Sequence, residues 1–276
     1  MQIGIVAAPG PLEGTASVAA RLQEVARRVE DLDYAGLWIT DSIGRAAPSL
    51  DPLLLLAAAA PVTKRIELGT CVLQVPLRQP AELAHRVMSL DVLCEGRLRL
   101  GVGAGSTAGD FLAVQADYDR RFTTLRESLP VMRRSWQGEA VFGPAVKPWP
   151  GHEQGPPLFL GAWHSPRWIE FAARECQGWM GSGIYSTIDQ VADGVGQFRA
   201  GAGGRIILAN VFTDLRPNPP SHPLIDRAKI NLVCDPVEAR ERLARIADSG
   251  VDDVLLICPF NDPDQLEQVR ELWPGD

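Results

Sequence analysis

The side chains that could carry chemistry in this chain are few, and they do not form a metal site or a catalytic pair of acids. The four histidines, His85, His152, His164 and His222, have no spacing that would let two of them bind one metal ion. Asp41 has no close carboxylate partner of the kind that glycoside hydrolysis requires. We therefore expect neither metal-assisted hydrolysis nor glycoside chemistry.

A glycine motif, Gly103-x-Gly105-x-x-Ala108, matches the dinucleotide-binding fingerprint and follows an expected strand. That strand is the fourth of the chain rather than the first, and no strand-ending acid follows at the usual distance. In the alternative interpretation, Gly101 and Gly103 simply permit the close approach of neighbouring backbones. We favour this structural interpretation over a dinucleotide site.

Ser165 and Pro166 open an expected helix directly after a strand, a geometry that binds phosphate through backbone N–H groups and a hydroxyl. An ordinary helix N-cap would leave the same pattern. Trp163 and His164 precede this helix and could stack on a ligand and hydrogen-bond to it, or they could form a solvated loop pair. Both questions stay open at this point.

Three further residues each have a structural and a functional interpretation. Asp41 follows a strand, as a polar group beside a cofactor would, but a turn aspartate would do the same. Cys71 has no neighbour in the sequence that would lower the pKa of its thiol, so we interpret it as a small buried residue rather than a nucleophile. Trp38 lies within a strand segment, and so does Trp179, and we assign both to the core.

Strand and helix patterns alternate along the whole chain and decide where these residues lie. Eight strand–helix pairs in about 250 residues predict an α/β fold of the (β/α)8 TIM-barrel class, and we expect one domain over residues 1–276. Excursions are expected after the fourth strand (Thr107–Arg120), before the fifth (Glu139–Pro157) and after the seventh (Leu215–Asp226). The expected strands are Ile3–Ala8, Gly36–Thr40, Ile66–Leu73, Arg97–Val102, Leu158–Gly161, Trp179–Ser182, Ile206–Phe212 and Val254–Cys258.

The active site of such a barrel lies at the C-terminal ends of its strands. These ends are poor in acids, bases and nucleophiles and rich in small residues, which leaves room for a broad flat ligand approached by backbone groups. A cofactor would then supply the organic chemistry. The expected strand ends are Ala7-Ala8, Asp41-Ser42, Thr70–Val72, Gly103–Ser106, Gly161–Ser165, Gly181–Gly183, Thr213-Asp214 and Pro259–Asn261.

Composition excludes several other classes of protein. The net charge of −7 argues against a nucleic-acid or anionic-membrane surface, because both need clustered Lys and Arg. The longest apolar run, Leu53–Ala60, is far shorter than the roughly 18 residues of a membrane helix. The five cysteines include no Cys-x-x-Cys, and the first residues have no basic region of a signal peptide. We expect a reduced, cytoplasmic protein without structural zinc.

The segment LGTCVLQVPLRQPAELAHRVMSLDVLCEGRLRLGVGAG resembles the central signature of the bacterial-luciferase-like flavin-dependent monooxygenases. The resemblance covers Ile3 to about Ile257. It implies a (β/α)8 barrel that binds reduced FMN or a 5-deazaflavin at its C-terminal face. FMN members use O2, whereas deazaflavin members transfer hydride. Other segments that share the resemblance are Glu30…Gly36-Leu37-Trp38 with Asp41, Arg121–Trp136, and Gly161…Ser165 followed by Phe171-Ala172-Ala173.

Position by position, the resemblance implies a non-proline cis peptide at Cys71–Val72 that supports the isoalloxazine ring. It implies that Gly103 lies close to the reactive edge of the ring, and that Ser165 begins the phosphate-binding helix. We predict Asp41 and His164 as catalytic residues and no metal ligand. The predicted cofactor-binding residues are Ala7, Thr70, Cys71, Val72, Gly103, Gly161, Ala162, Ser165 and Gly181.

Two departures from the family pattern bear on the function. Ser42 stands where many members have a catalytic histidine, and Ala104 stands where luciferases have a basic residue that holds the phosphate. His164, Arg78 and Arg167 are the nearby candidates to replace that cation.

We predict a flavin-dependent oxidoreductase or monooxygenase that uses reduced FMN and O2 on a small organic substrate. A deazaflavin-dependent hydride-transfer enzyme is one alternative. A non-catalytic flavin-binding scaffold is another, motivated by Ser42 and Ala104. The implied partners are the flavin, a small-molecule substrate, a separate flavin reductase, and a second copy of the chain, since relatives often dimerise.

Overall fold

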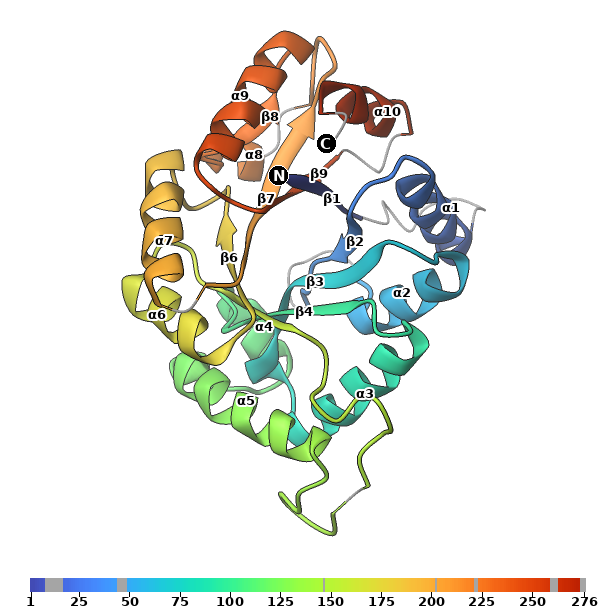
Figure 1. The fold of residues 1–276 in the computed structure, drawn as a ribbon, viewed down its shortest axis with the longest axis vertical. Helices are drawn as coiled ribbons and strands as arrows, with labels where there is room; N and C mark the ends of the chain where they lie inside the picture. Colours follow the sequence, from blue (N-terminus) through green and yellow to red (C-terminus); the bar gives the residue numbers. More distant parts are fainter. Residues whose placement is uncertain are drawn as a thin grey trace.

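Parallel strands close into a barrel in the computed structural model, and helices surround the strands (Figure 1). The ring runs in the order β1–β2–β3–β4–β5–β6–β7–β9, and β9 pairs with β1 to close it. The closed eight-stranded ring confirms the predicted TIM barrel and rules out the open sheet of a dinucleotide-binding domain. The structure describes residues 1–7, 17–43, 49–145, 147–201, 203–220, 223–258 and 263–273.

The strands of the ring are short and buried, as expected for a parallel sheet covered on its outer face. Their side chains alternate between the barrel interior and the layer of helices. Their bounds are β1 (Gln2–Val6), β2 (Gly36–Ile39), β3 (Glu67–Gln74), β4 (Leu98–Gly103), β5 (Leu158–Gly161), β6 (Gly178–Ser182), β7 (Arg205–Asp214) and β9 (Asp253–Ile257).

Several helices begin at side chains that cap them. Gln79 accepts a hydrogen bond from the N–H of Glu82 at the start of α3, and Asp235 caps α9 in the same way. The helix bounds are α1 (Val18–Asp31), α2 (Pro52–Ala59), α3 (Pro80–Leu93), α4 (Ala108–Ala113), α5 (Arg121–Trp136), α6 (Pro166–Glu175), α7 (Ile188–Gly201), α8 (Pro223–Arg227), α9 (Pro236–Asp248) and α10 (Pro263–Leu272).

The excursions contain more regular structure than the sequence predicts. The segment Thr107–Arg120 contains α4, and the segment after β7 leads through α8 to a ninth strand, β8 (Asn231–Val233). β8 pairs with the last residues of β7, outside the closed ring. A strand of three residues is too short to show a period of two, which is why the sequence did not reveal it.

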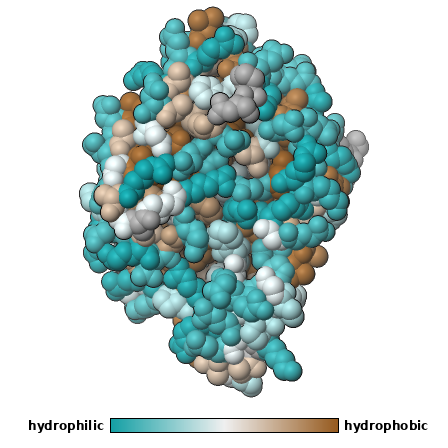
Figure 2. Space-filling view, in the orientation of Figure 1, coloured by the Kyte–Doolittle hydropathy of each residue, from teal (hydrophilic) through white to brown (hydrophobic). Residues whose placement is uncertain are grey.

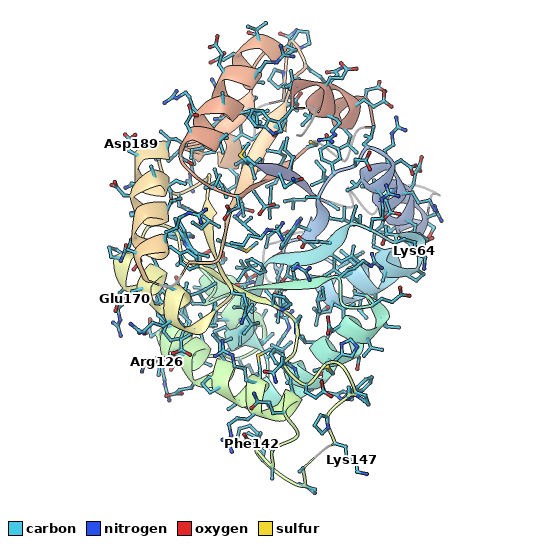
Figure 3. The ribbon with its side chains drawn as sticks, viewed as in Figure 1. Lys64, Arg126, Phe142, Lys147, Glu170 and Asp189 are labelled. Atoms are coloured by element: carbon cyan, nitrogen blue, oxygen red, sulfur yellow. The ribbon has the colours of Figure 1, made fainter. Side chains whose placement is uncertain are left out.

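Polar residues cover the outside of the molecule. Hydrophilic residues predominate on the face seen in Figure 2, and hydrophobic ones occur there in small groups. Figure 3 shows Arg126, Glu170 and Asp189 on the outer helices α5, α6 and α7. Phe142 and Lys147 lie on the segment that extends away from the ring between α5 and β5. Among the described residues, none of the helices is both long and apolar enough to cross a membrane.

A tryptophan lies in the middle of the barrel, within a cluster of apolar side chains from several strands. Trp38 on β2 is 1% exposed and belongs to an interior cluster with Phe159, whose ring meets it edge to face at 6.5 Å. Gly4, Gly36 and Gly69 face the indole, and a Cβ atom on any of them would lie within 3 Å of it. Trp38 is therefore a core residue, as predicted, and Trp179 is fully buried against the helices.

Ion pairs close the N-terminal end of the barrel. The guanidinium of Arg205 on β7 donates to both carboxylate oxygens of Glu67 at 2.8 and 2.7 Å, and to Asp253 at 2.7 Å. Arg99 on β4 donates to Glu67 at 2.7 Å. Burial would lower the pKa of Arg205, but its bonds to these carboxylates raise it further. A charged layer below and Trp38 above leave the C-terminal end as the open end of the barrel.

Strand β3 carries an irregularity at its C-terminal end. The Cys71–Val72 peptide bond is cis, as the resemblance implies, and the register with β4 shifts between Thr70 and Leu73. The hydroxyl of Thr70 donates to the carbonyl of Gly101 at 2.7 Å. A Cβ atom on Gly101 would lie 2.0 Å from the carbonyl oxygen of Thr70, so only glycine fits beside this bend.

Candidate functional site

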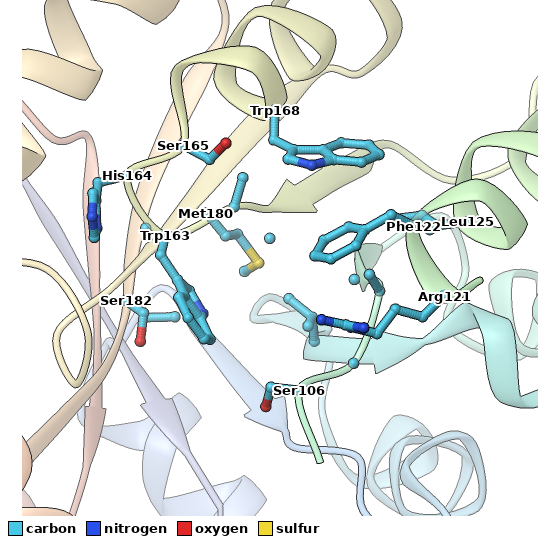
Figure 4. A pocket seen from close by; sticks show the side chains of 18 of the residues that line it. Ser106, Arg121, Phe122, Leu125, Trp163, His164, Ser165, Trp168, Met180 and Ser182 are labelled. Carbon is cyan, nitrogen blue, oxygen red and sulfur yellow. The ribbon is translucent and has the colours of Figure 1, made fainter. Parts of the chain in front are cut away.

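A pocket of about 400 Å³ opens at the C-terminal ends of β3–β7 (Figure 4). Its volume lies within the range of small-molecule and cofactor sites. In the described part of the chain, no group of three or more His, Cys, Asp or Glu residues could hold a metal ion. The pocket is lined by Val72, Gly103, Ala104, Gly105, Ser106, Tyr118, Arg121, Phe122, Leu125, Gly161, Ala162, Trp163, His164, Ser165, Trp168, Met180, Gly181, Ser182, Ala209 and Asn210.

The floor of the pocket is the side chain of Val72 with two glycines against it. A Cβ atom on Gly103 would lie 2.6 Å from Cγ2 of Val72, and one on Gly161 would lie 2.9 Å from its Cγ1. Larger residues at positions 103 and 161 would displace Val72. The bend in β3 and the glycines of β4 and β5 therefore form one apolar surface.

Aromatic side chains form the walls. Trp163, after β5, stacks on Tyr185, after β6, with ring centroids 4.0 Å apart. Phe122 on α5 stacks on Trp168 of α6 at 5.4 Å. Figure 4 shows Trp163 on one side of the pocket and Phe122 with Trp168 on another. Such walls suit a planar ligand and exclude water from it.

Arg121, the first residue of α5, brings a cation into the pocket. Its guanidinium carbon lies 3.9 Å from the ring centre of Tyr118 and 4.5 Å from that of Phe122, and Nη1 donates to the carbonyl of Tyr118 at 2.9 Å. Its Nε is buried and has no hydrogen-bond partner. The Tyr118 hydroxyl donates to the carbonyl of Ser106 at 3.1 Å, which fastens this segment to the loop after β4. The guanidinium is thus held in place while its Nε–H remains without a hydrogen-bond acceptor.

Ser165 stands at the start of α6, where the sequence predicts a phosphate-binding helix end. It is the N-cap residue, but its hydroxyl makes no capping hydrogen bond. The hydroxyl and the positive end of a ten-residue helix therefore stand at the pocket, and both favour an anion.

At the β6–β7 side, the pocket wall contains two neutral polar residues. Ser182 is 4% exposed, and its hydroxyl has no hydrogen-bond partner. It pairs in register with Ala209, which precedes Asn210 at a shift in the β7–β9 pairing. Asn210 has a left-handed backbone with a φ of 61°, which asparagine tolerates better than most residues. Leaving a buried hydroxyl unpaired costs about 1–3 kcal/mol.

Asp41, predicted as catalytic, does not line the pocket. Its carboxylate accepts two hydrogen bonds from Arg78, at 2.6 and 3.0 Å, and one from the N–H of Gln74 at 2.8 Å. Burial lowers the pKa of Arg78, but the bonds and charge of Asp41 raise it above its usual value. The amide of Gln74 bridges the carbonyl of Asp41 to the carboxylate of Asp110. Asp41 thus joins the end of β2 to the end of β3.

The other predicted site residues divide into two groups. Ala7, Thr70 and Cys71 are buried and lie outside the pocket lining. Burial raises the pKa of the Cys71 thiol, in agreement with its interpretation as an inert core residue. The residues that the pocket does bring together are Val72, Gly103, Gly161, Ala162, His164, Ser165 and Gly181.

The guanidinium that lines the pocket belongs to Arg121, which the sequence did not reveal as a site residue. Of the three candidates, Arg78 is held by Asp41 and Arg167 is exposed outside the lining, while His164 lines the pocket. Arg121 follows Ala104 by 17 positions, so only the fold brings them together. Ser182 was in principle detectable, because Met180 faces inward and residue 182 follows it by one period of the strand.

Some predicted strand-end residues lie outside the described part of the chain. These are Ala8 and Pro259–Asn261, and His222 in the excursion after β7 does so too.

Comparison with known proteins agrees with this architecture. Residues 1–205 match the model of a family described as luciferase-like monooxygenase. The chain is 31% identical over 225 residues to an uncharacterized protein of Mycobacterium tuberculosis (strain ATCC 25618 / H37Rv), covering 78% of this chain and 72% of that protein. The crystal structure of the monooxygenase RslO1 from Streptomyces bottropensis has a TM-score of 0.83 at 20% identity, covering 99% of each chain.

Two further solved structures share the fold and differ in the cofactor that they contain. One is the oxygenating constituent of 3,6-diketocamphane monooxygenase from Pseudomonas putida in complex with FMN. It has a TM-score of 0.75 at 17% identity, covering 100% of this chain and 98% of that one. The other is an F420-dependent secondary alcohol dehydrogenase in complex with an F420–acetone adduct, with a TM-score of 0.73 at 17% identity, covering 99% and 98%. At these identities the likeness concerns the fold.

Proposed function

The chain belongs to the luciferase-like monooxygenase family, and we propose that it is a flavin-dependent oxidoreductase that uses reduced FMN and O2 on a small organic substrate. The observation that carries this proposal is the pocket floor, where Val72 lies against Gly103 and Gly161 and leaves an apolar surface for a ring. A bound flavin would supply the oxidation chemistry, so the protein has to bind the ring, orient it and exclude water.

The residues present fit such a cofactor at both of its ends. We propose that the ring lies on Val72, Gly103 and Gly161, with Ala162 and Gly181 beside it. We assign the phosphate to Ser165 and the N-terminal end of α6, with Arg121 as its cation. The orphaned Nε of Arg121 and the unused hydroxyl of Ser165 support this assignment.

Two residues are proposed for supporting and proton-transfer roles. His164 lines the pocket and is exposed, so its imidazole is within reach of a ligand there. Asp41 is proposed to act through structure, since its ion pair with Arg78 holds the loop that follows β3. Ala7, Thr70 and Cys71 would support the ring only through the backbone of their strands.

The cellular setting completes the proposal. All five cysteines are free, which supports a reducing, cytoplasmic location. A separate reductase would supply the reduced FMN, and we retain the single domain over residues 1–276 and a homodimer as proposals.

The proposal is tested first by the binding of FMN and then by the turnover of a substrate. Purified protein should quench the fluorescence of FMN in a saturable titration, since tryptophan rings line the pocket. With a flavin reductase and a panel of aldehydes, sulfonates and ketones, at least one compound should raise O2 consumption above the level without protein. Saturable binding of the deazaflavin with little binding of FMN would favour hydride transfer instead. Binding of neither cofactor would sink the proposal.

A further inference from the structure

Ser182 is the most unusual polar residue of the pocket wall. The residue is 4% exposed and lines the pocket (Figure 4), and its hydroxyl has no hydrogen-bond partner. Its register partner on β7, Ala209, carries no polar side-chain group. A hydroxyl in such a wall is stabilised only when something in the pocket bonds to it.

We infer that the Ser182 hydroxyl is a binding group that donates a hydrogen bond to a neutral carbonyl oxygen of the molecule in the pocket. The inference rests on the proposed function, because it assigns a contact within the same site. The amide of Asn210, one residue beyond the register partner of Ser182, is a second neutral group at the same place.

The charges of the pocket favour a neutral ligand group at this position. Among the described lining residues, the ionisable side chains are Tyr118, Arg121 and His164. Figure 4 shows Arg121 on the far side of the pocket from Ser182, and His164 on the same side as Ser182. The nearest lining residues in sequence, Met180 and Gly181, bring no charge. A carboxylate or phosphate here would lose water without reaching the guanidinium of Arg121, whereas a carbonyl needs only one donor.

A carbonyl at this site could belong to either of two molecules. The ring of a flavin or deazaflavin carries two carbonyl groups on its pyrimidine part, and an oxidisable small molecule can carry one as well. The contact has the same chemistry in both cases, so binding experiments have to separate the sources.

The chain contains a matched control for this test. Ser186 is fully buried, and its hydroxyl is also unpaired, but it does not line the pocket. Both Ser182→Ala and Ser186→Ala remove an orphaned buried hydroxyl, so neither should lower the melting temperature. Only Ser182→Ala should change ligand binding.

Riboflavin separates the ring from the phosphate, and cyclohexanone serves as a simple carbonyl probe. We would titrate riboflavin into the wild type and both variants, and cyclohexanone into the free and the riboflavin-loaded proteins. Ser182→Ala is expected to weaken one of the two probes about three- to ten-fold, with Ser186→Ala unchanged. Weaker binding of riboflavin by Ser182→Ala would identify the ring carbonyl as the partner. Weaker binding of cyclohexanone alone would identify the substrate carbonyl.

Equal affinities of both probes for the wild type and Ser182→Ala would overturn the inference and leave the proposed function intact. An equal loss in Ser186→Ala would overturn it too, because the effect would then be structural. If the wild type binds neither flavin nor the ketone, the inference and the proposed function fail together. Asn210→Gly keeps the left-handed backbone and removes the amide, so a loss confined to that variant would assign the contact to Asn210 instead.

Discussion

The guanidinium of Arg78 and the carboxylate of Asp41 form a two-pronged ion pair that is almost sealed from water. Their side chains are 9% and 1% exposed, and the closest N···O distance is 2.6 Å. Arg78 also lies 3.5 Å from Asp51, which in turn pairs with Arg86 on α3. An aspartate at the end of β2 therefore fastens the loop after β3 instead of facing the pocket.

Asp41→Asn should therefore act on stability. It leaves the buried Arg78 without its main counter-charge, and we expect the free energy of unfolding in urea to fall by about 3 kcal/mol. Asp33→Asn is the control: Asp33 pairs with Arg65 at 3.1 Å, but both are well exposed, and the change should stay within about 0.5 kcal/mol. Lost turnover with unchanged stability and flavin binding would show instead that Asp41 is catalytic.

Gly103→Ala should damage the pocket floor. The new Cβ atom would lie 2.6 Å from Cγ2 of Val72, so the valine has to move. We expect the dissociation constant of FMN to rise about tenfold or more, as overpacking commonly costs 1–3 kcal/mol. Gly143→Ala, where a Cβ atom meets no atom within 4 Å, should bind FMN like the wild type. Equal affinities for Gly103→Ala and the wild type would contradict the proposed placement of the ring.

Arg121→Gln should weaken the binding of FMN and leave the binding of riboflavin unchanged. The loss of a charge-assisted contact to phosphate is expected to raise the dissociation constant of FMN about 10- to 100-fold, while riboflavin has no phosphate to lose. Arg120→Gln removes a neighbouring arginine whose side chain is 63% exposed, and should change neither value. A similar loss for both ligands would mean that Arg121 shapes the pocket rather than binding an anion.

Glu30 should make the stability depend on pH. Its Oε2 accepts hydrogen bonds from the N–H groups of Lys64, Arg65 and Ile66, at 2.7, 2.7 and 3.2 Å. Burial raises the pKa of Glu30, but these three bonds outweigh it and hold the pKa below its usual value. A lowered pKa gives stability that is full above the unfolded value of about 4.3 and is lost as pH falls through the folded value.

We therefore expect Glu30→Gln to be less stable than the wild type by about 1 kcal/mol at pH 7. This difference in the free energy of unfolding between the variant and the wild type should become smaller below about pH 4.3. Urea unfolding at several pH values between neutral and mildly acidic would measure it. Glu24→Gln, at an exposed position on the same helix, is the control. A gap that is constant with pH would show that the carboxylate charge plays no part.

Much of the fold could be predicted from the sequence because each barrel strand is recognisable from a short segment of residues. Apolar runs bounded by turns predicted the strands of the ring at nearly the bounds that the structure has. The Ser165–Pro166 pair correctly predicted the start of α6. The cis peptide at Cys71–Val72 followed from the resemblance and is present. These features depend on residues that are close in sequence.

The parts of the site that the sequence did not reveal depend on long-range contacts. Asp41 looks like a rim residue until Arg78, 37 positions later, is seen to neutralise it. Arg121 is the first residue of α5, and the apolar periodicity of that helix predicts only which face packs against the barrel. The fold brings Arg121 to the pocket. The β6–β7 register pairs Ser182 with Ala209, next to Asn210, and no local periodicity predicts which residues of two strands will pair.

The packing of Trp38 also has a consequence for anyone who redesigns this protein. Barrel interiors are usually shared among side chains from alternate strands, and here one of these side chains, the indole of Trp38, also occupies space that three glycines leave free. Adding even a methyl group at position 4, 36 or 69 would require a compensating change at Trp38, and at position 36 also a shift of the Glu67 carbonyl. Such paired exchanges are rarely reached by single mutations. Directed evolution of new substrates should therefore leave Trp38 unchanged and diversify the loops above it.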